Sequence, residues 1–257
     1  MTKQLEVYQF PCLSDNYGYL VHDNQTGVTA AIDTPDYVAI GKALDLKNWQ
    51  LSFIFNTHHH PDHAGGNLAL KAQTNCKIIG PRQDAERIPG IDILVGDQDT
   101  CSLGIWTFEV YDTPGHTKGH IVYFCSQAGI AFVGDTLFAL GCGRLFEGTP
   151  QQMWESLQKI SAWPDDTLIY CAHEYTEANA RFALSVEPEN HDLILRSEQI
   201  VQTRSSGSPT IPTTLGLEKK TNPFLRSHSD NLQKTIGLTG KTELEIFTRT
   251  RELKDNF

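Results

Sequence analysis

The sequence lacks the features of membrane-spanning and secreted proteins. No apolar stretch runs uninterrupted for long enough to cross a bilayer. Residues 1–20 form no signal-peptide pattern, because Pro11, Asp15 and Asn16 break every apolar run. The six cysteines are scattered without a CxxC pair, which favours reduced thiols over a disulfide framework. We therefore expect a cytoplasmic protein.

Basic residues are also few. Lys and Arg total 21 against 31 Asp and Glu, so the formal net charge is −10. Such a surface repels phosphate backbones and anionic lipids, which argues against nucleic-acid and membrane partners and favours a small-molecule partner. With 257 residues and 39% apolar content, the chain can form one large domain or a domain with an appendage, and we expect a monomer.

One short stretch is dense in side chains that bind metals. Residues 57–66 read Thr-His-His-His-Pro-Asp-His-Ala-Gly-Gly, with five such side chains within six residues. The apolar run at 51–55 is typical of a buried strand, so the cluster begins where a strand ends. Because so many clustered histidines would be costly to bury without a metal, the stretch predicts a metal site.

Three further predicted strands end at polar side chains. The strands at 106–111, 130–133 and 168–171 are followed by His116, Asp135 and His173. In layered α/β proteins, ligands gather beyond the carboxyl ends of strands, so these groups should converge with the cluster if the strands are neighbours. Strands are also predicted at 5–10, 17–22, 28–32, 77–80 and 121–124, and helices at 37–46, at 67–73 and from Thr149-Pro150 onward.

The pattern changes after His173. Residues 174–205 predict two helices separated near Pro188, and further helices are predicted at 230–236 and 244–254. No strand is expected beyond about residue 175. We therefore predict a sheet-rich domain that contains the metal site over residues 1–173 and a helical domain over 174–257.

The spacing of the ligands predicts two ions. In an extended segment, His58 and His60 point the same way, and Pro61 keeps that segment extended. Asp62 and His63 then point elsewhere, toward a second ion. A carboxylate can bridge two metals and an imidazole normally cannot, so Asp135 is the expected bridge. The resulting partition places His58, His60 and His116 on one ion and Asp62, His63 and His173 on the other.

Zinc is the expected metal, and iron or manganese would accept the same ligands. Two such ions can hold a hydroxide between them and polarise a carbonyl, which favours hydrolysis, with Asp62 and Asp135 as the catalytic carboxylates. His59 and His120 are placed outside the ligand set, where they could support the ligands.

The motifs resemble those of a known superfamily. The segment Thr57 to His63 matches the HxHxDH signature of the metallo-β-lactamase superfamily, and its later metal motifs resemble residues 113–117, 134–136 and 172–175. Four segments are similar to glyoxalase II, the hydroxyacylglutathione hydrolase family: 135–149, 173–176, 221–226 and 251–257. The resemblance implies an α/β (α+β) fold, a four-layer αββα sandwich with a C-terminal helical domain. It also implies hydrolysis of S-D-lactoylglutathione to D-lactate and glutathione, the second step of methylglyoxal detoxification.

The resemblance also implies substrate contacts. Tyr175, Arg251 and Lys254 match glutathione-contacting positions, while Arg144 stands where lysine is usual and Phe146 where tyrosine is common. Independently, Arg251 and Lys254 continue the helical spacing of Leu244 and Phe247, so all four should face the protein. A solvated cationic helix end is the alternative, but an anionic substrate on an acidic protein needs a local positive patch.

Three other functions are compatible with parts of this pattern. A mononuclear iron glutathione-persulfide dioxygenase would use fewer ligands and lack the long helical region after His173. A non-catalytic relative would be expected to lose ligands, whereas all seven are present. Nucleic-acid processing is disfavoured by the acidic balance.

Overall fold

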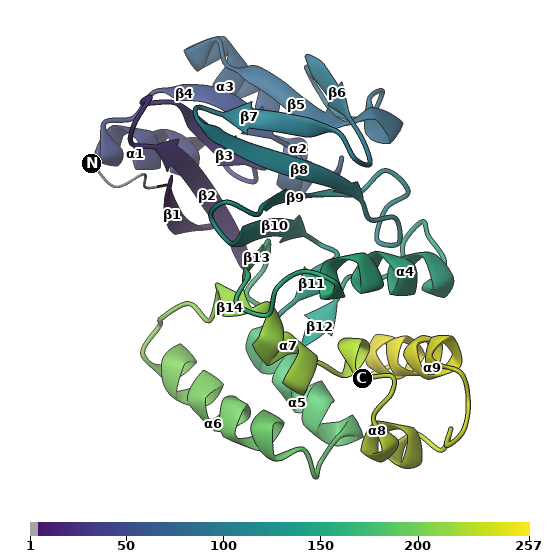
Figure 1. The fold of residues 1–257 in the computed structure, drawn as a ribbon. Helices are drawn as coiled ribbons and strands as arrows, with labels where there is room; N and C mark the ends of the chain where they lie inside the picture. The colour runs from purple at the N-terminus through teal and green to yellow at the C-terminus, as the bar shows by residue number, and fades with distance from the viewer. Residues whose placement is uncertain (1–4) are drawn as a thin grey trace. The chain divides into compact units, whose positions relative to one another are not determined.

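The computed structural model describes residues 5–257 (Figure 1). The first four residues, part of the stretch searched for a signal peptide, lie outside the described residues. The chain divides into two compact units, Met1–Asp112 with Lys118–Gly134, and Thr113–Thr117 with Asp135–Phe257. The predicted domain boundary after His173 stays a prediction. Among residues 5–257, no helix combines the length and apolar character needed to cross a membrane.

The first unit contains a six-stranded sheet. Its strands run in the order β1 to β6, with bounds Leu5–Cys12, Asn16–Asp23, Thr29–Ile32, Leu51–Phe55, Lys77–Pro81 and Ile93–Val95. The strands β1, β2 and β3 pair antiparallel, and β3 to β6 pair parallel. The parallel pairing places the carboxyl ends of these strands at one edge. The histidine cluster follows β4 at that edge.

Four antiparallel strands form a second sheet within this unit. They lie in the order β10-β9-β8-β7, with bounds Ile130–Gly134, Ile121–Cys125, Trp106–Asp112 and Thr100–Leu103. The two sheets share a core in which Phe55 contacts Phe108 and Tyr123, with ring centroids 5.8 and 5.2 Å apart. The buried Tyr123 hydroxyl donates to the Asn56 carbonyl at 2.8 Å. This bond ties the second sheet to the backbone just before the cluster.

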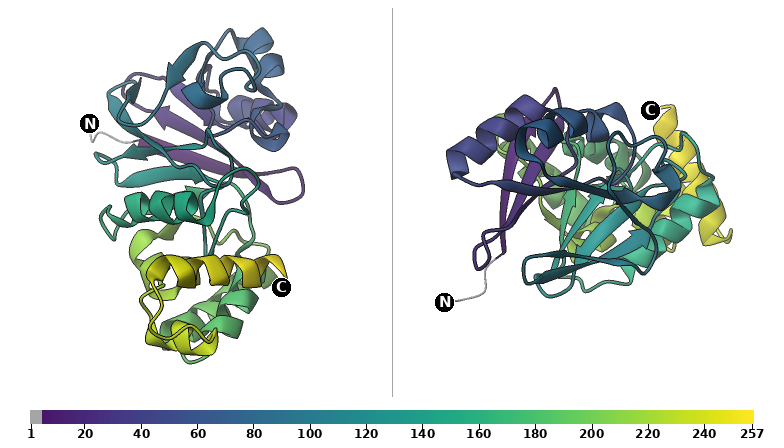
Figure 2. Two further views of the ribbon diagram at one scale, coloured as in Figure 1. Left: turned by 90° about the vertical axis from the view of Figure 1, so that its right-hand side faces the viewer. Right: turned by 90° about the horizontal axis from the view of Figure 1, so that it is seen from above.

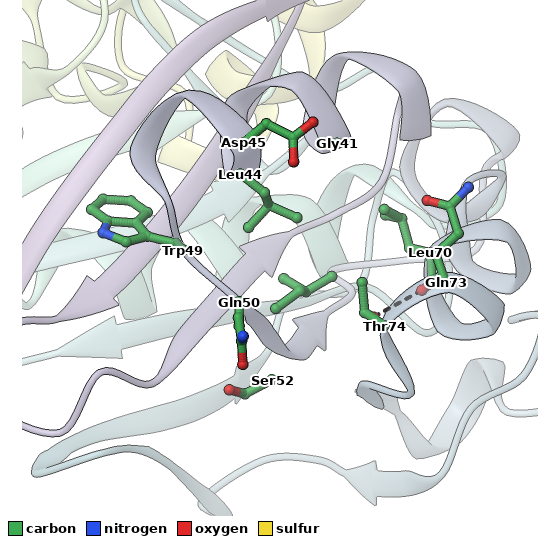
Figure 3. A pocket seen from close by; sticks show the side chains of 10 residues that line it. Gly41, Leu44, Asp45, Trp49, Gln50, Ser52, Leu70, Gln73 and Thr74 are labelled. Carbon is green, nitrogen blue, oxygen red and sulfur yellow. Dashed lines mark hydrogen bonds between the residues drawn. The ribbon is translucent and has the colours of Figure 1, made fainter.

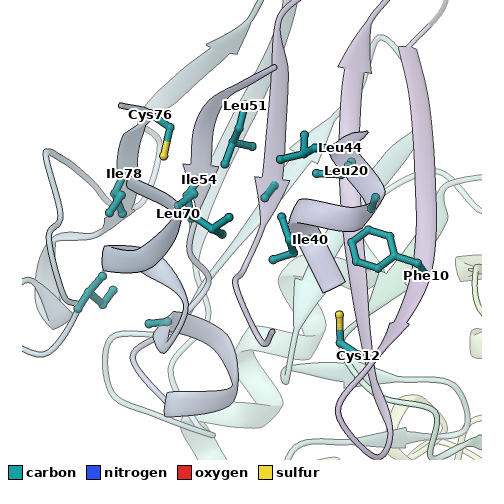
Figure 4. Close-up of a cluster of buried hydrophobic side chains, with 14 residues drawn as sticks. Phe10, Cys12, Leu20, Ile40, Leu44, Leu51, Ile54, Leu70, Cys76 and Ile78 are labelled. Carbon is teal, nitrogen blue, oxygen red and sulfur yellow. The ribbon is translucent and has the colours of Figure 1, made fainter. Parts of the chain in front are cut away.

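Two helices cover the other face of the first sheet. These are α1 (Tyr37–Lys47) and α3 (Asn67–Thr74), and the short α2 (Pro61–Ala64) and the 3₁₀ turn η1 (Arg82–Asp84) lie in connections of the same unit. Ile40 and Leu70 pack from the helices against Leu20 and Ile54 of the strands (Figure 4). Burying each such side chain contributes about 1.5–3 kcal/mol. A helical layer and two sheet layers therefore make up this unit.

A pocket of about 520 Å³ opens between α1, α3 and the start of β4 (Figure 3). Trp49, Gln50 and Leu70 are among the residues that line it. None of the predicted metal ligands lines this pocket, so it belongs to a different part of the unit from the cluster.

The second unit is mainly helical. Its elements are β11 (Leu137–Phe138), β12 (Gly141–Cys142), α4 (Pro150–Ser161), β13 (Leu168–Cys171), α5 (Thr176–Val186), α6 (His191–Ser205), β14 (Thr213–Thr214), α7 (Leu215–Thr221), η2 (Pro223–Leu225), α8 (Asp230–Thr235) and α9 (Glu243–Asp255). The α4 and α9 helices lie side by side, as do α5 and α6 (Figures 1 and 2). Thr149 caps α4 in a capping box with Gln152, and Pro150 is its first residue, as predicted.

Several short elements differ from the prediction. A strand does occur beyond residue 175, because Thr213 and Thr214 of β14 pair with Ile169 and Leu168 of β13. Two-residue strands have no periodicity that a sequence pattern could reveal. The α7 helix and the β11–β12 hairpin were likewise not expected. On α9, Phe247 and Arg251 are buried as predicted, whereas Leu244 and Lys254 are only half-buried.

All six cysteines are buried and none forms a disulfide, in agreement with the expectation of free thiols. Burial raises the pKa of Cys12, Cys101 and Cys171 to about 12 and that of Cys142 to about 11. At neutral pH these thiols stay protonated, so they are poor nucleophiles.

Candidate metal centre

The first unit brings four of the predicted ligands together in two pairs. His60 keeps an extended backbone (φ −57°, ψ 148°) before Pro61, and its Nδ1 lies 3.1 Å from Nε2 of His58. The helical turn of α2 then begins at Pro61, and it places the His63 ring beside the His58 ring, with centroids 4.0 Å apart. Within this turn, Nε2 of His63 lies 3.5 Å from Oδ2 of Asp62.

The second unit brings the other three predicted ligands together around Asp135. Its Oδ2 lies 3.3 Å from Nε2 of His116, and its Oδ1 lies 3.5 Å from Nε2 of His173. All three residues are buried. Each oxygen of the carboxylate therefore faces a different histidine, so this carboxylate could bind one ion through each oxygen.

These distances fit bound divalent ions. Two ligand atoms that each lie about 2.0–2.2 Å from one ion are roughly 2.8–3.6 Å apart, for angles between octahedral and tetrahedral. The four pairs His58–His60, Asp62–His63, His116–Asp135 and His173–Asp135 span 3.1–3.5 Å. The donor set is imidazole and carboxylate, which suits zinc, iron or manganese. Each half of the ligand set thus fits the metals expected from the sequence.

Neighbouring acceptors determine which nitrogen of two histidines carries the proton. Nδ1 of His116 donates to the Arg144 carbonyl at 2.8 Å, and Nδ1 of His63 donates to the Asp33 carboxylate at 2.8 Å. Because a carbonyl and a carboxylate only accept, the neutral rings keep their proton on Nδ1 and present the Nε2 lone pair as the ligand atom.

Thr57 fixes the tautomer of His58 in the same way. Its hydroxyl donates to Oδ2 of Asp33 at 2.8 Å and lies 3.0 Å from Nδ1 of His58. Since that hydroxyl has one proton and gives it to Asp33, it accepts from Nδ1 of His58. Asp33 also accepts from the Thr57 backbone N–H at 2.7 Å. The buried Asp33 therefore orients both His58 and His63.

Sequence reasoning missed this role of Asp33. The signal that could have found it was present, because the strand predicted at 28–32 ends at this carboxylate just as the other strands end at ligands. Its φ of 55° lies in the left-handed region, which Asp and Asn tolerate better than most residues.

We expect Asp33→Asn to weaken metal binding by about 10- to 100-fold, the usual cost of losing a partner that orients a ligand. Asparagine keeps the backbone conformation but offers one acceptor oxygen where the carboxylate offers two. Competition against a chromogenic chelator measures the affinity. Asp45→Asn, which changes an exposed carboxylate on α1, is the matched control. An unchanged affinity in Asp33→Asn would show that Asp33 does not orient the ligands.

The two histidines placed outside the ligand set have other surroundings. Nδ1 of His59 lies 2.8 Å from Oδ2 of the fully buried Asp84, which also pairs with Arg87. The buried ring of His120 stacks beside His58, with centroids 4.8 Å apart. Their exclusion from the ligand set stays a prediction.

Two of the predicted substrate residues lie against ligands of the second unit. The Tyr175 ring is 38% exposed and stacks parallel to the His173 ring, with centroids 4.8 Å apart. The Phe146 ring is 61% exposed and meets His116 edge-on at 5.2 Å. Exposed aromatic rings against His173 and His116 offer apolar surfaces that a bound molecule could contact.

The predicted basic residues gather around Asp255. Arg251 is buried, and its Nε and Nη2 donate to Oδ1 of Asp255 at 3.1 and 2.8 Å, while its Nη1 donates to the Cys142 carbonyl at 2.9 Å. Nε of the exposed Arg144 lies 3.6 Å from the same Asp255 oxygen. Burial, together with the charges of Arg251, Arg181 and Arg144, holds the pKa of Lys254 below its ordinary value. Positive charge is thus concentrated on one part of this unit.

The chain matches two family models. The metallo-beta-lactamase superfamily model matches residues 26–173, and the model for the hydroxyacylglutathione hydrolase C-terminus matches residues 174–257. A hydroxyacylglutathione hydrolase from Maricaulis maris is 54% identical over 254 residues, which are 99% of each chain. This chain belongs to the hydroxyacylglutathione hydrolase family.

Solved structures show the same fold. The crystal structure of ETHE1 from Myxococcus xanthus has a TM-score of 0.69 at 25% identity, over 96% of this chain and 90% of that one. The di-iron-bound form of TTHA1623 has a TM-score of 0.62 at 21% identity, over 86% of this chain and all of the other. The predicted metallo-β-lactamase fold, C-terminal helical region and assignment to a family of thioester hydrolases are confirmed. Membership in this superfamily and the His and Asp clusters support a divalent metal.

Proposed function

We propose that this hydroxyacylglutathione hydrolase cleaves S-(2-hydroxyacyl)glutathione thioesters, with S-D-lactoylglutathione giving D-lactate and glutathione, as the second step of methylglyoxal detoxification in the cytoplasm. One observation carries the proposal beyond family membership. The two carboxylate oxygens of Asp135 each face one histidine at a distance suited to a shared ion, beside exposed aromatic rings and a concentration of basic side chains.

The proposed ligand assignment follows the sequence-based partition. His58, His60 and His116 would hold one ion, Asp62, His63 and His173 the other, and Asp135 both. The pair distances within each unit support the assignment, and so does the protonation of His58, His63 and His116 on Nδ1. Zinc is the proposed metal, and the protein is proposed to be a monomer. Its dimetal domain would comprise residues 1–173 and its substrate-binding domain residues 174–257.

The chemistry divides between the metals and the chain. Bound divalent ions lower the pKa of water to about 7 and polarise a carbonyl oxygen. Asp62 would accept the proton that the attacking water loses, and Asp135 would hold both ions in place. The Asn16 amide donates to Oδ2 of Asp62 at 3.3 Å and orients that carboxylate. Thiolate is a good leaving group, so no strong general acid is needed.

The chain's remaining residues bind the thiol part of the substrate. Glutathione carries two carboxylates, and Arg144, Arg251 and Lys254 would neutralise them. Arg251 already donates three N–H groups to Asp255 and Cys142, so it supports the patch mainly by its charge and by holding Asp255. Arg144 and Lys254 are the more accessible cations. Tyr175 and Phe146 would contact the bound molecule beside His173 and His116.

The decisive experiment compares two thioesters of D-lactate on the purified, metal-loaded protein. We expect glutathione release from S-D-lactoylglutathione to be much faster than thiol release from S-D-lactoyl-N-acetylcysteamine, because the latter lacks both carboxylates. Turnover should continue without oxygen and stop with a chelator, and metal analysis should find two ions per chain. Equal rates on both thioesters would contradict the proposed substrate. A requirement for oxygen would favour the persulfide dioxygenase instead.

A further inference from the structure

The ammonium group of Lys254 lies between two aromatic rings. Its Nζ is 5.2 Å from the centroid of Phe182 and 5.4 Å from that of Phe257, and the two rings meet edge-on with centroids 5.5 Å apart. The same Nζ donates to the Ala178 carbonyl at 3.4 Å. Both ring distances are within the range of about 6 Å in which a cation is attracted to an aromatic face.

The contacts with the two rings and the carbonyl matter because the other surroundings of Lys254 disfavour its positive charge. The side chain is half-buried, and the guanidinium groups of Arg251, Arg181 and Arg144 repel it. A lysine stem also has four rotatable bonds, so an ammonium that must meet a carboxylate at a defined place has to be ordered first. The two ring faces and the Ala178 carbonyl attract the ammonium group and restrict its position.

The two rings contribute differently. Phe182 is 1% exposed and stacks on Phe224 in the core of the unit, so its removal would damage the fold. Phe257 is 65% exposed, and its backbone N–H donates to the Lys254 carbonyl at 3.4 Å, which places it at the end of α9. Its ring can therefore be changed with little loss of core packing.

We infer that Phe257 is a positioning residue that holds the ammonium of Lys254 in place for a carboxylate of the glutathione moiety. This inference rests on the proposed function, because it assigns Phe257 a part in binding the thiol portion of that substrate. Phe257 does not touch the reacting atoms, so it should act on substrate binding and leave the chemical step unchanged.

Three substitutions of Phe257 distinguish the cation–π contact of its ring from the burial of Lys254 by any apolar side chain. Phe257→Ala should raise the KM for S-D-lactoylglutathione by about three- to tenfold, the factor supplied by one partly buried cation–π contact, with kcat unchanged. Phe257→Leu keeps an apolar side chain without a π face and should behave like alanine. Phe257→Tyr keeps the ring and should retain the low KM. Calorimetric affinity for glutathione should change in parallel.

A double-mutant cycle tests whether Phe257 acts through Lys254. In the Lys254→Ala background, Phe257→Ala should have no further effect on KM, because the cation that the ring holds is gone. The inference is overturned if Phe257→Ala leaves KM unchanged in the parent enzyme, if Phe257→Leu retains the low KM, or if the effect persists without Lys254. Failure of the proposed function would look different, because then the parent enzyme itself would not turn over the thioester.

Discussion

Replacing Asp135 by alanine should reduce thioester hydrolysis by about a thousandfold or more. A correctly held metal site supplies several kcal/mol of transition-state stabilisation, and each 1.4 kcal/mol corresponds to about a tenfold change in rate. Asp135 faces His116 with one oxygen and His173 with the other, so its loss removes a ligand from both proposed ions at once. We expect kcat to fall with the metal content, which should drop from two ions per chain.

Two controls show whether the loss of activity in Asp135→Ala comes from lost metal binding or from unfolding. Asp166→Ala removes an exposed carboxylate in the same unit and should leave both turnover and metal content unchanged. Thermal unfolding of Asp135→Ala, compared with the metal-free parent protein, separates loss of ligation from loss of folding. If Asp135→Ala kept two ions and full turnover, the bridging role would be wrong.

Glu218→Ala should destabilise the protein by about 3–5 kcal/mol, the cost of leaving a buried partner uncompensated. The Glu218 carboxylate is fully buried and pairs with the buried Arg196. It also accepts hydrogen bonds from the Thr213 hydroxyl at 2.7 Å, the Leu140 N–H at 2.8 Å and the Asn222 amide at 3.1 Å. Alanine would leave the guanidinium of Arg196 buried without its charge partner.

Urea unfolding measures this loss as a change in the free energy of unfolding. Glu198→Ala, on the exposed side of α6, is the matched control and should stay within about 0.5 kcal/mol of the parent. The double variant Arg196→Met with Glu218→Leu should be more stable than Glu218→Ala, because it leaves no unpaired buried charge, but less stable than the parent, because the Leu140 N–H loses its acceptor. A change below 1 kcal/mol in Glu218→Ala would mean that water reaches Arg196 and solvates it.

Local patterns in the sequence were sufficient for the larger elements and for proposing the candidate ligands. The runs at 51–55 and 168–171 are apolar, so they predict strands, and His58 and His173 follow them in the chain. The helices at 37–46 and 244–254 were likewise predicted close to their observed ends. These features depend on residues that are neighbours in sequence, which is why periodicity and spacing reveal them.

Contacts between distant residues were beyond such reasoning. The end of the strand at 28–32 marks Asp33 as a candidate, but no local pattern identifies Thr57 and His63 as its donors. Nothing near Arg144 indicates that its carbonyl will accept from His116. The two-residue strand at Thr213–Thr214 exists only because β13 offers it a pairing partner.

The sequence by itself therefore determined the family and the order of the candidate metal ligands along the chain. The tertiary structure alone decided which nitrogen of His58, His63 and His116 carries its proton, and that each oxygen of Asp135 faces a different histidine. It also decided that Phe182 and Phe257 enclose Lys254. The physical reason is that protonation and orientation depend on the acceptors and rings that folding brings within about 3–6 Å, and these come from parts of the chain that no local pattern connects.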